Sequence, residues 1–498
     1  MPRGGAKGEQ IATMRYRYQM YQRLYEALPD ILERARGERP RLGTDRLEGQ
    51  VGLYPGSSGC PGLLPAFVLE PVIASNRGRI QPVRGYQEEL RCLIKDIYGD
   101  DYEVVALNTC ESILRLVNEV AFAPPTMRKG DAYRARVIVP FNEDFEYLGA
   151  YGRPFPPIYK GLSADRSVSA GEFSVEGKSL ANLDTLYVKY AGAHYQVHGI
   201  HPNITPFLLE VAVDATIEKF RRTADRHAAF LTGFQSIGYD TPGYGHHEKN
   251  DRNAPRMLSE TSRLAHDLDL PHFVDCGGGL PVIGYGPDDV GADYMCWSMD
   301  KAGRTLTCGL LVGREEAMLP VRKAAGVAGQ RYGDTVSHGK ALYSFADPGR
   351  DALVALIAYL RVLKNEPQRV TDPIDRFHDI LVEAFDSFKF KDLGAGILLT
   401  KSYSWGGTEI NYERTWSDRE FGIPVSTIDD YFSNTNVISL ALEAMGVAPA
   451  TIYSGNMFVT PGLGTLDEEG RLIEENAQVA GRALVRAMEI VCEAAGVG

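Results

Sequence analysis

The chain has 498 residues, 44% of them hydrophobic, and carries a formal net charge of −12. This length and apolar content are enough to bury a large core in two or three domains. The acidic balance argues against a broad basic surface, so nucleic acid is not expected as a partner. No run of apolar residues reaches the length of a membrane-spanning helix, so no membrane partner is expected either.

Seven cysteines are spread along the sequence and form no Cys-x-x-Cys pair. An odd, scattered set fits a reducing compartment better than a disulfide framework. The N-terminus also lacks the apolar core of a secretory signal. These observations predict a cytoplasmic protein.

Three regions follow from the pattern of apolar residues. Residues 1–80 are predicted to form an N-terminal helix, over Ala12–Arg36, and an arm. Strands and helices alternate over residues 81–365, which predicts a large α/β domain with a mostly parallel sheet flanked by helices. Residues 366–498 are expected to form a smaller α+β domain that ends in a helix over Asp467–Ala495.

The first apolar strand of the large domain is predicted at Val104–Leu107 and is followed by the polar residues Asn108 and Thr109, then Cys110 and an amphipathic helix. Thr109 and Ser112 place hydroxyls and free backbone N–H groups at the start of this helix. Such a start can bind a phosphate group, and it equally suits a plain helix cap. Taken alone, the segment leaves both interpretations open.

A histidine-rich stretch lies between the first strand and the next clear one. His194, His198 and His201 have helical spacing, which could suit a metal ion. Gly199 and Pro202 instead predict a loop, which removes the argument from spacing. We therefore predict no metal site.

Two later strands end in polar residues. An apolar strand over Ala228–Phe234 leads to Ser236, and Pro271–Gly279 predicts a short buried strand that ends in Asp275 and a glycine turn. An acid at the carboxyl end of a parallel strand lies where α/β proteins place ligand-binding groups. A buried carboxylate needs a partner, and a protonated ring nitrogen is a suitable one. The alternative is that Asp275 orders a turn.

Lys301 lies in a short polar break between two apolar strands in the stretch Gly291–Arg314, with Ser298 three residues before it. A partly desolvated ammonium loses its proton more easily, and the free amine can form a Schiff base with an aldehyde. In isolation, Ser-x-x-Lys is more often a solvated loop. Its position after the strand of Asp275 favours the catalytic interpretation.

In their order along the chain, these segments resemble the fold-type I pyridoxal-phosphate enzymes. Three parts of the chain resemble more narrowly the aminotransferase class V group and its relatives of the selenocysteine synthase type: Arg84–Leu90 with Ile97–Gly99, Gly291–Lys301, and Gly333–Leu363. The resemblance covers over half of the chain. It implies a large domain with a sheet of the seven-stranded type, a smaller C-terminal domain and a homodimer or higher homo-oligomer.

The resemblance also implies roles for individual residues. Lys301 would hold the cofactor aldehyde and move the α-proton, and Asp275 would pair with the pyridine nitrogen. The remaining residues would bind the cofactor: Asn108, Thr109 and Cys110 at the phosphate, with Ser298 adding a hydroxyl, and Ser236 at a strand end that opens toward the cofactor. The carbanion formed on the substrate is then stabilised by the cofactor itself.

Two parts of the expected site stay open. An aromatic residue usually stacks on the cofactor ring, and Phe141, Phe145 and Tyr147 are all candidates. A substrate carboxylate usually meets an arginine. The candidates for that contact are Arg331, Arg350 and Arg414.

The reaction is predicted at the level of its class. We expect a pyridoxal-phosphate-dependent lyase or β/γ-replacement enzyme in amino-acid metabolism. An aminotransferase, or another α-carbon enzyme such as a decarboxylase or desulfurase, is the alternative. A non-catalytic dimeric scaffold is a remote alternative, against which the presence of Lys301 and Asp275 argues.

Overall fold

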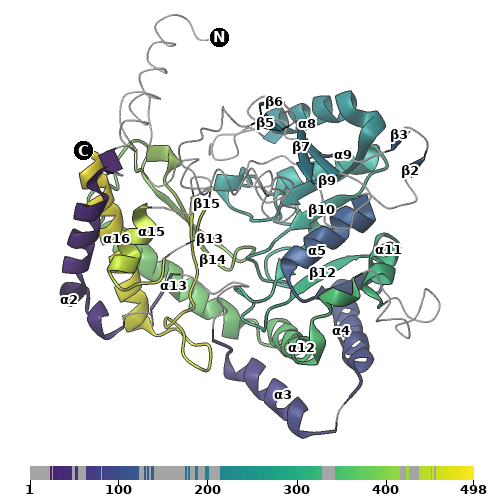
Figure 1. Cartoon of the computed structure of the whole chain (residues 1–498), viewed down its shortest axis with the longest axis horizontal. Coiled ribbons are helices and arrows are strands. Elements are labelled where there is room, and N and C mark those ends of the chain that lie inside the picture. The colour runs from purple at the N-terminus through teal and green to yellow at the C-terminus, as the bar shows by residue number, and fades with distance from the viewer. Residues whose placement is uncertain are drawn as a thin grey trace, which may run out of the picture.

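The structure is a computed structural model. It describes residues 23–24, 26–47, 51–53, 63–79, 81–122, 128–129, 132–133, 136–138, 174–175, 178–179, 185–188, 197–200, 213–327, 343–415, 422–424, 437–449, 451–453 and 456–497. These residues form an eight-stranded sheet, a four-stranded sheet and two short ribbons, β2–β3 (Arg128–Lys129 and Ala132–Tyr133) and β5–β6 (Ser174–Val175 and Lys178–Ser179). Figure 1 shows the four-stranded sheet to the left of the large sheet. Among the described helices, none has the length and apolar character needed to cross a bilayer.

The large sheet is mostly parallel. Its strands lie in the order β1 (Tyr102–Leu107), β12 (Gly309–Arg314), β11 (Tyr294–Ser298), β10 (His272–Asp275), β9 (Leu231–Ile237), β4 (Arg136–Ile138), β8 (Val197–Ile200) and β7 (Thr185–Val188). The strands from β11 to β8 are parallel, β12 runs antiparallel to both neighbours, and β7 adds an antiparallel edge. The predicted sheet is therefore confirmed, with eight strands in place of the seven-stranded type.

Helices cover both faces of this sheet, because side chains along each strand alternate between the faces. One face packs Val274, Trp297 and Leu310 against helices on its own side. The other face packs Phe273, Cys296 and Leu311 against a second set. The helices on the first face are α3 (Ala66–Arg77), α4 (Val83–Tyr98) and α12 (Gly349–Asn365), and α8 (Val213–His227) and α9 (Arg256–Asp267) cover the rest of that face. The helices on the second face are α5 (Cys110–Leu116), the π-helix η2 (Val117–Phe122) and α11 (Glu315–Ala325).

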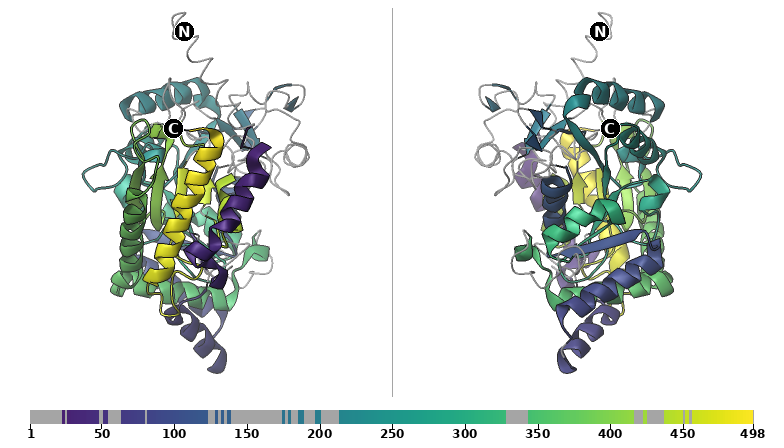
Figure 2. Two further views of the ribbon diagram at one scale, coloured as in Figure 1. Left: turned by 90° about the vertical axis from the view of Figure 1, so that its left-hand side faces the viewer. Right: turned by 90° about the vertical axis from the view of Figure 1, so that its right-hand side faces the viewer.

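The smaller sheet is antiparallel and lies in the C-terminal part of the chain, as predicted for an α+β domain. Its order is β13 (Leu398–Ser402), β14 (Gly407–Asn411), β16 (Asn456–Val459) and β15 (Thr451–Tyr453). Its core includes α13 (Gln368–Asp386), α15 (Val437–Ala444), α16 (Glu474–Ala495) and helical residues from 26 to 42. Figure 2 shows the N-terminal helix beside α16.

The last helix begins later than its apolar pattern predicts. Asp467 accepts hydrogen bonds from the backbone N–H groups of Glu469 and Arg471, at 2.9 and 2.8 Å, and so forms a turn. Aspartate commonly closes turns in this way. α16 therefore starts at Glu474 rather than at Asp467.

The two sheets are joined where the turn after β13 crosses the glycine turn after β10. The N–H of Leu280 donates to the carbonyl of Tyr403 at 3.1 Å. A Cβ atom at Gly279 would lie 2.0 Å from the carbonyl oxygen of Ser404, so only glycine permits this approach of the two backbones. The turn thus sets the smaller sheet against the carboxyl-terminal edge of the large one.

A buried carboxylate joins two helices to the edge strand β1. Glu103 is fully buried, accepts hydrogen bonds from Arg91 at 2.8 and 2.9 Å, and lies 2.9 Å from Arg322 and 3.5 Å from Lys95. Burial raises the pKa of Glu103, but the Arg91 hydrogen bonds and the three positive charges lower the pKa more, to below its ordinary value. The charged group therefore stabilises the packing of α4 and α11 on β1.

Glu103→Gln should destabilise the protein, because it leaves the part-buried guanidinium groups of Arg91 and Arg322 without their carboxylate. We expect a loss of about 3 kcal/mol in the free energy of unfolding at neutral pH. Since folding lowers the pKa of Glu103, this stabilisation is present above the unfolded value of about 4.3 and is lost as pH falls through the folded value. Chemical denaturation at pH 7 and at about pH 3 measures both effects. The exposed neighbour Glu88 offers a control, and equal losses in Glu88→Gln and Glu103→Gln would contradict this account.

Gly279→Ala should separate the two sheets at their turn, because the added methyl overlaps a backbone oxygen. We expect a loss of about 2–3 kcal/mol in the free energy of unfolding and a red shift in the emission of the buried Trp405. The matched control is Gly481→Ala within α16, where the added Cβ makes ordinary contacts from 3.4 Å. That change should be neutral or stabilise the helix by up to about 1 kcal/mol. Similar behaviour of the two variants would refute the role of Gly279.

Candidate functional site

Lys301 lies at the carboxyl end of β11, in the break before β12. Its N–H contacts the carbonyl of Ser298 at 3.4 Å, and the N–H of Arg304 donates to the Lys301 carbonyl at 3.0 Å. The hydroxyl of Tyr359 on α12 donates to the carbonyl of Ala302 at 2.9 Å. The backbone of the lysine is thus held by turns and by a buried tyrosine, and its side chain is half-buried.

Asp275 is the last residue of β10, and its side chain is 1% exposed. The register of the parallel pair places Asp275 beside Cys296 of β11, whose thiol donates to Oδ1 at 3.1 Å. The Sγ atom of Cys110 lies 3.8 Å from the Sγ atom of Cys296. A thiol is a weak hydrogen-bond donor, so the bond that Asp275 accepts from Cys296 is a weak one.

The electrostatics of Cys110 link the predicted residues to one another. The hydrogen bond with Cys296 lowers the pKa of Cys110, but burial and the charges of Asp275 and Glu111 raise the pKa above its ordinary value. The ammonium of Lys301 acts on the same thiol in the opposite direction. Lys301, Asp275 and the start of α5 therefore lie within electrostatic reach of one group.

The polar residues before α5 form a capped helix start. The N–H of Ser112 donates to Oγ1 of Thr109 at 3.1 Å, and the Ser112 hydroxyl donates to Oδ1 of Asn108 at 2.7 Å. A Cβ atom at Gly309 of β12 would lie 2.5 Å from the carbonyl of Thr109 and 2.8 Å from Cα of Cys110, so this glycine lets the helix start lie against the sheet. Both sequence interpretations, cap and anion site, are compatible with this geometry.

Two predicted serines are placed differently from Asp275. Ser298 is buried and donates to Oδ1 of Asp300 at 2.8 Å, so its hydroxyl proton is already engaged in a hydrogen bond. Ser236 pairs in register with Val274, and its hydroxyl contacts Nε2 of His272 at 2.9 Å. Because alternate residues of a strand face opposite sides, Ser236 lies on the face away from Asp275. The structure therefore does not bring Ser236 to the predicted site.

The open candidates for the ring and the carboxylate are only partly described. Phe141, Phe145, Tyr147 and Arg331 lie outside the described residues. Arg350 stands at the start of α12, where its guanidinium binds Asp351 at 2.9 Å and also contacts Asn76 of α3. Arg414 lies in the short turn Glu413–Thr415. The arginine that would bind the substrate carboxylate therefore stays a prediction, and none of the three candidates is assigned to that contact.

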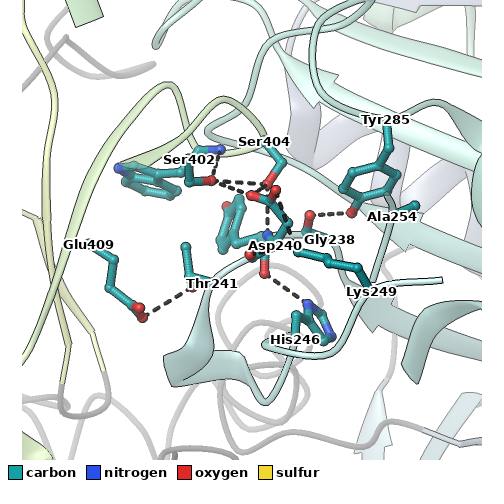
Figure 3. Close-up of polar contacts among 12 residues, drawn as sticks. Gly238, Asp240, Thr241, His246, Lys249, Ala254, Tyr285, Ser402, Ser404 and Glu409 are labelled. Carbon is teal, nitrogen blue, oxygen red and sulfur yellow. Dashed lines mark hydrogen bonds and ion pairs between the residues drawn. The ribbon is translucent and has the colours of Figure 1, made fainter. Parts of the chain in front are cut away.

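The turn of the smaller domain closes over this edge of the sheet, which sequence reasoning did not predict. Figure 3 shows Ser402 and Ser404 pointing toward Asp240, which follows β9. The Ser402 hydroxyl donates to Oδ1 of Asp240 at 2.6 Å, the Ser404 hydroxyl donates to the same atom, and the Asp240 N–H donates to the Ser404 oxygen at 2.7 Å. Glu409 of β14 accepts from Thr241 at 3.1 Å. The smaller domain is therefore held to the loop after β9 by buried polar contacts.

An aromatic group lies beneath this turn. The N–H of Gly278 donates to the hydroxyl of Tyr239 at 3.1 Å, and the rings of Tyr239 and Trp405 meet edge to face at 4.6 Å. Tyr244 and Phe458 complete the cluster. One sequence feature could have indicated this cluster, namely the aromatic residues around Trp405. Tyr239 could have been found only from its position after a predicted strand.

Two buried histidines, His246 in the loop after β9 and His272 at the start of β10, stay neutral at physiological pH. Burial lowers the pKa of His246 to about 3, and it lowers the pKa of His272 to about 3 as well. His246 contacts the carbonyl of Tyr239 through Nδ1 at 2.8 Å, and His272 lies between Ser236 and Ser262. Neither imidazole is therefore suited to donate a proton at neutral pH.

Comparison with known proteins gives a likeness in fold only. No protein-family model and no curated protein matches the sequence. An aminotransferase from Bacillus anthracis has a similar structure with a TM-score of 0.50 and 11% identity, over 85% of this chain and 85% of that one. An aminotransferase from Vibrio fluvialis, crystallised in its PMP-bound form, has a TM-score of 0.49 and 14% identity, over 86% and 85%. Ureidoglycine–glyoxylate aminotransferase from Bacillus subtilis has a TM-score of 0.47 and 12% identity, over 91% and 94%.

The first of these likenesses shows the fold. It covers 85% of this chain at a TM-score of 0.50. The predicted fold class is confirmed: the chain has a mixed α/β fold with a mostly parallel sheet flanked by helices, similar to that of this aminotransferase.

Proposed function

We propose that this chain is a pyridoxal-phosphate-dependent enzyme that acts at the α-carbon of an amino-acid substrate. One observation carries the proposal. In this fold, a half-buried lysine follows β11 while a buried carboxylate ends the adjacent strand β10, and both act electrostatically on the same thiol. The carboxyl edge of a parallel sheet is where α/β proteins bind their ligands, so both groups stand where a cofactor would bind.

The residues present fit the cofactor. Oδ1 of Asp275 now accepts a hydrogen bond from a thiol, and a protonated pyridine nitrogen would replace this weak donor with a charge-assisted one. The start of α5 lies against β12 beside the same group and offers backbone N–H groups for a phosphate. Asn108, Thr109 and Cys110 would hold that phosphate. Ser298 would add its hydroxyl only after giving up its hydrogen bond to Asp300.

Each side chain then has a defined task. Lys301 would bind the cofactor aldehyde through Nζ, and the same atom would later accept or return the proton of the substrate α-carbon. Asp275 would hold a proton on the ring nitrogen. When bound, the cofactor supplies the electron sink that stabilises negative charge on the α-carbon. The turn after β13, held by Asp240, would exclude water from this edge of the sheet.

The reaction type has two candidates. Our first proposal is a lyase or replacement enzyme, suggested by the likeness of residues 291–363 to the selenocysteine synthase type. An aminotransferase is supported equally, and a decarboxylase or desulfurase uses the same groups. A fold is shared by many chemistries, so the choice depends on the substrate.

The proposal includes a cytoplasmic homodimer or higher homo-oligomer. Support comes from α3, which exposes Leu69 and Ile73 one turn apart, 40% and 39% accessible, near Leu63 at 76%. Exposed apolar side chains that gather into a patch mark interaction surfaces in soluble proteins.

Lys301→Ala should abolish both cofactor attachment and turnover. The test uses the purified chain with added pyridoxal phosphate, its visible absorption band, and borohydride reduction followed by peptide mapping. We expect the reduced adduct on the peptide of Lys301 and none in the variant, with an unchanged circular dichroism spectrum. Lys323→Ala, a lysine of α11 in the same domain, is the matched control. An adduct that survives in Lys301→Ala, or turnover by that variant, would refute the assignment.

A single-donor experiment should separate the two reaction types. We incubate the loaded enzyme with one amino acid that carries a β- or γ-leaving group and with no acceptor. A lyase should release keto acid, ammonia and leaving group over many turnovers, whereas a replacement enzyme should release the leaving group without keto acid and turn over only when a nucleophile is added. An aminotransferase should release about one equivalent of keto acid per chain and stop. The first proposal predicts either many turnovers or release of the leaving group alone, and one equivalent of keto acid followed by a stop would reject it.

A further inference from the structure

Two thiols and a carboxylate converge from three separate elements beneath the proposed cofactor. Cys110 begins α5, Asp275 ends β10 and Cys296 lies in β11. One ligand atom from each lies within 4.8 Å of the others, and all three side chains are buried. The proposed reaction uses the carboxylate but neither thiol, so the thiol pair is unexplained by that function.

The spacing of this group matches a soft-metal site. Two thiolates that bind one Zn²⁺ at about 2.3 Å in tetrahedral geometry lie about 3.8 Å apart. The Sγ atoms of Cys110 and Cys296 are 3.8 Å apart. Cys296 Sγ and Oδ1 of Asp275, at 3.1 Å, would separate by a few tenths of an ångström to about 3.5 Å. The three ligands stand on a helix start and two paired strands, which hold them in place.

We propose that Cys110, Cys296 and Asp275 form a binding site for a thiophilic divalent cation, with Zn²⁺ as its ligand, and that this cation and pyridoxal phosphate exclude each other. The site itself depends only on the three side chains. The exclusion rests on the proposed function, because it requires Asp275 to be the partner of the cofactor ring.

The binding step balances as an exchange of protons for the cation. Each thiol loses its proton to solvent, two S–Zn bonds and one O–Zn bond form, and no electron is transferred. The hydrogen bond from Cys296 to Asp275 is replaced by two bonds to the same ion. Two thiolates and one carboxylate with one Zn²⁺ leave a net charge of −1, which the ammonium of Lys301 would offset at close range. A fourth position stays open for water.

The other buried thiols have a different environment and provide controls. Cys276 contacts the hydroxyl of Tyr285 at 3.6 Å and the carbonyl of Gly238 at 3.5 Å. Cys308 contacts Thr305 at 3.9 Å. Cys308→Ser therefore removes a buried thiol while leaving the group of three intact, and Cys92→Ser removes an exposed one.

The test is zinc binding by the full chain, stripped of cofactor and metal and kept reduced. Zn²⁺ is titrated against a colorimetric chelator, and Cd²⁺ is used to detect thiolate ligands by their ultraviolet charge-transfer band. We expect one Zn²⁺ per chain, two protons released per Zn²⁺ in weak buffer, and a loss of at least about 100-fold in affinity in Cys110→Ser and in Cys296→Ser. Cys308→Ser and Cys92→Ser should bind as the wild type does.

Three outcomes would overturn the site. They are no stoichiometric zinc, no thiolate band with Cd²⁺ on the wild-type chain, or equal affinity in Cys110→Ser and Cys308→Ser. The Cd²⁺ measurement uses the wild-type protein, so it tests the metal site even if a variant fails to fold. The exclusion is tested by adding pyridoxal phosphate to the Zn²⁺-loaded chain, which should show a lower yield of the band than the stripped chain. Equal yields would refute exclusion, whereas absence of the band from both would reject the proposed function and leave the metal site standing.

Discussion

The parallel pairing of β10 with β11 is the constraint on which the candidate site depends. It sets Asp275 beside Cys296 and carries the chain from Ser298 into the turn of Lys301. A shift of one residue in this register would turn Asp275 to the opposite face. There it would meet the apolar core that packs against α4 and α12, where a carboxylate has no polar partner among Val274, Trp297 and Leu310. The register is therefore required by the cost of burying that charge.

The second requirement is that α5 approach the sheet closely at the same point. Gly309 permits this, because any side chain there would overlap the backbone of Thr109 and Cys110. The approach places a helix start, a buried acid and a lysine around one pair of thiols. In surroundings of low dielectric constant, each charge acts strongly on its neighbours, as the raised pKa of Cys110 and the burial of Asp275 illustrate.

Sequence patterns predicted those parts of the molecule that depend on local periodicity. The strand that ends at Asp275, the two strands on either side of Lys301, the helix before Asp275 and the alternation of strands and helices all follow from runs of apolar residues. Periodicity could not place Ser236, because the face of the sheet on which a strand residue lies depends on pairing partners that are distant in sequence. The N-terminal helix shows the same limit: its apolar face is evident from the sequence, but its packing on the core of the smaller domain is not.

The turn after β13 could not be placed from sequence, and it bears most directly on the choice of reaction. Its serines bind Asp240, its backbone crosses Gly279, and Trp405 meets Tyr239, whose hydroxyl lies at the glycine turn after Asp275. On the proposed function, the large domain would supply the charged groups of the site and the smaller domain would supply much of its wall. A cofactor ring held by the charged groups could break any of several bonds at the α-carbon, and the bond held perpendicular to the ring is the one that breaks. The wall, rather than Lys301 or Asp275, is therefore where differences between a lyase and an aminotransferase should reside.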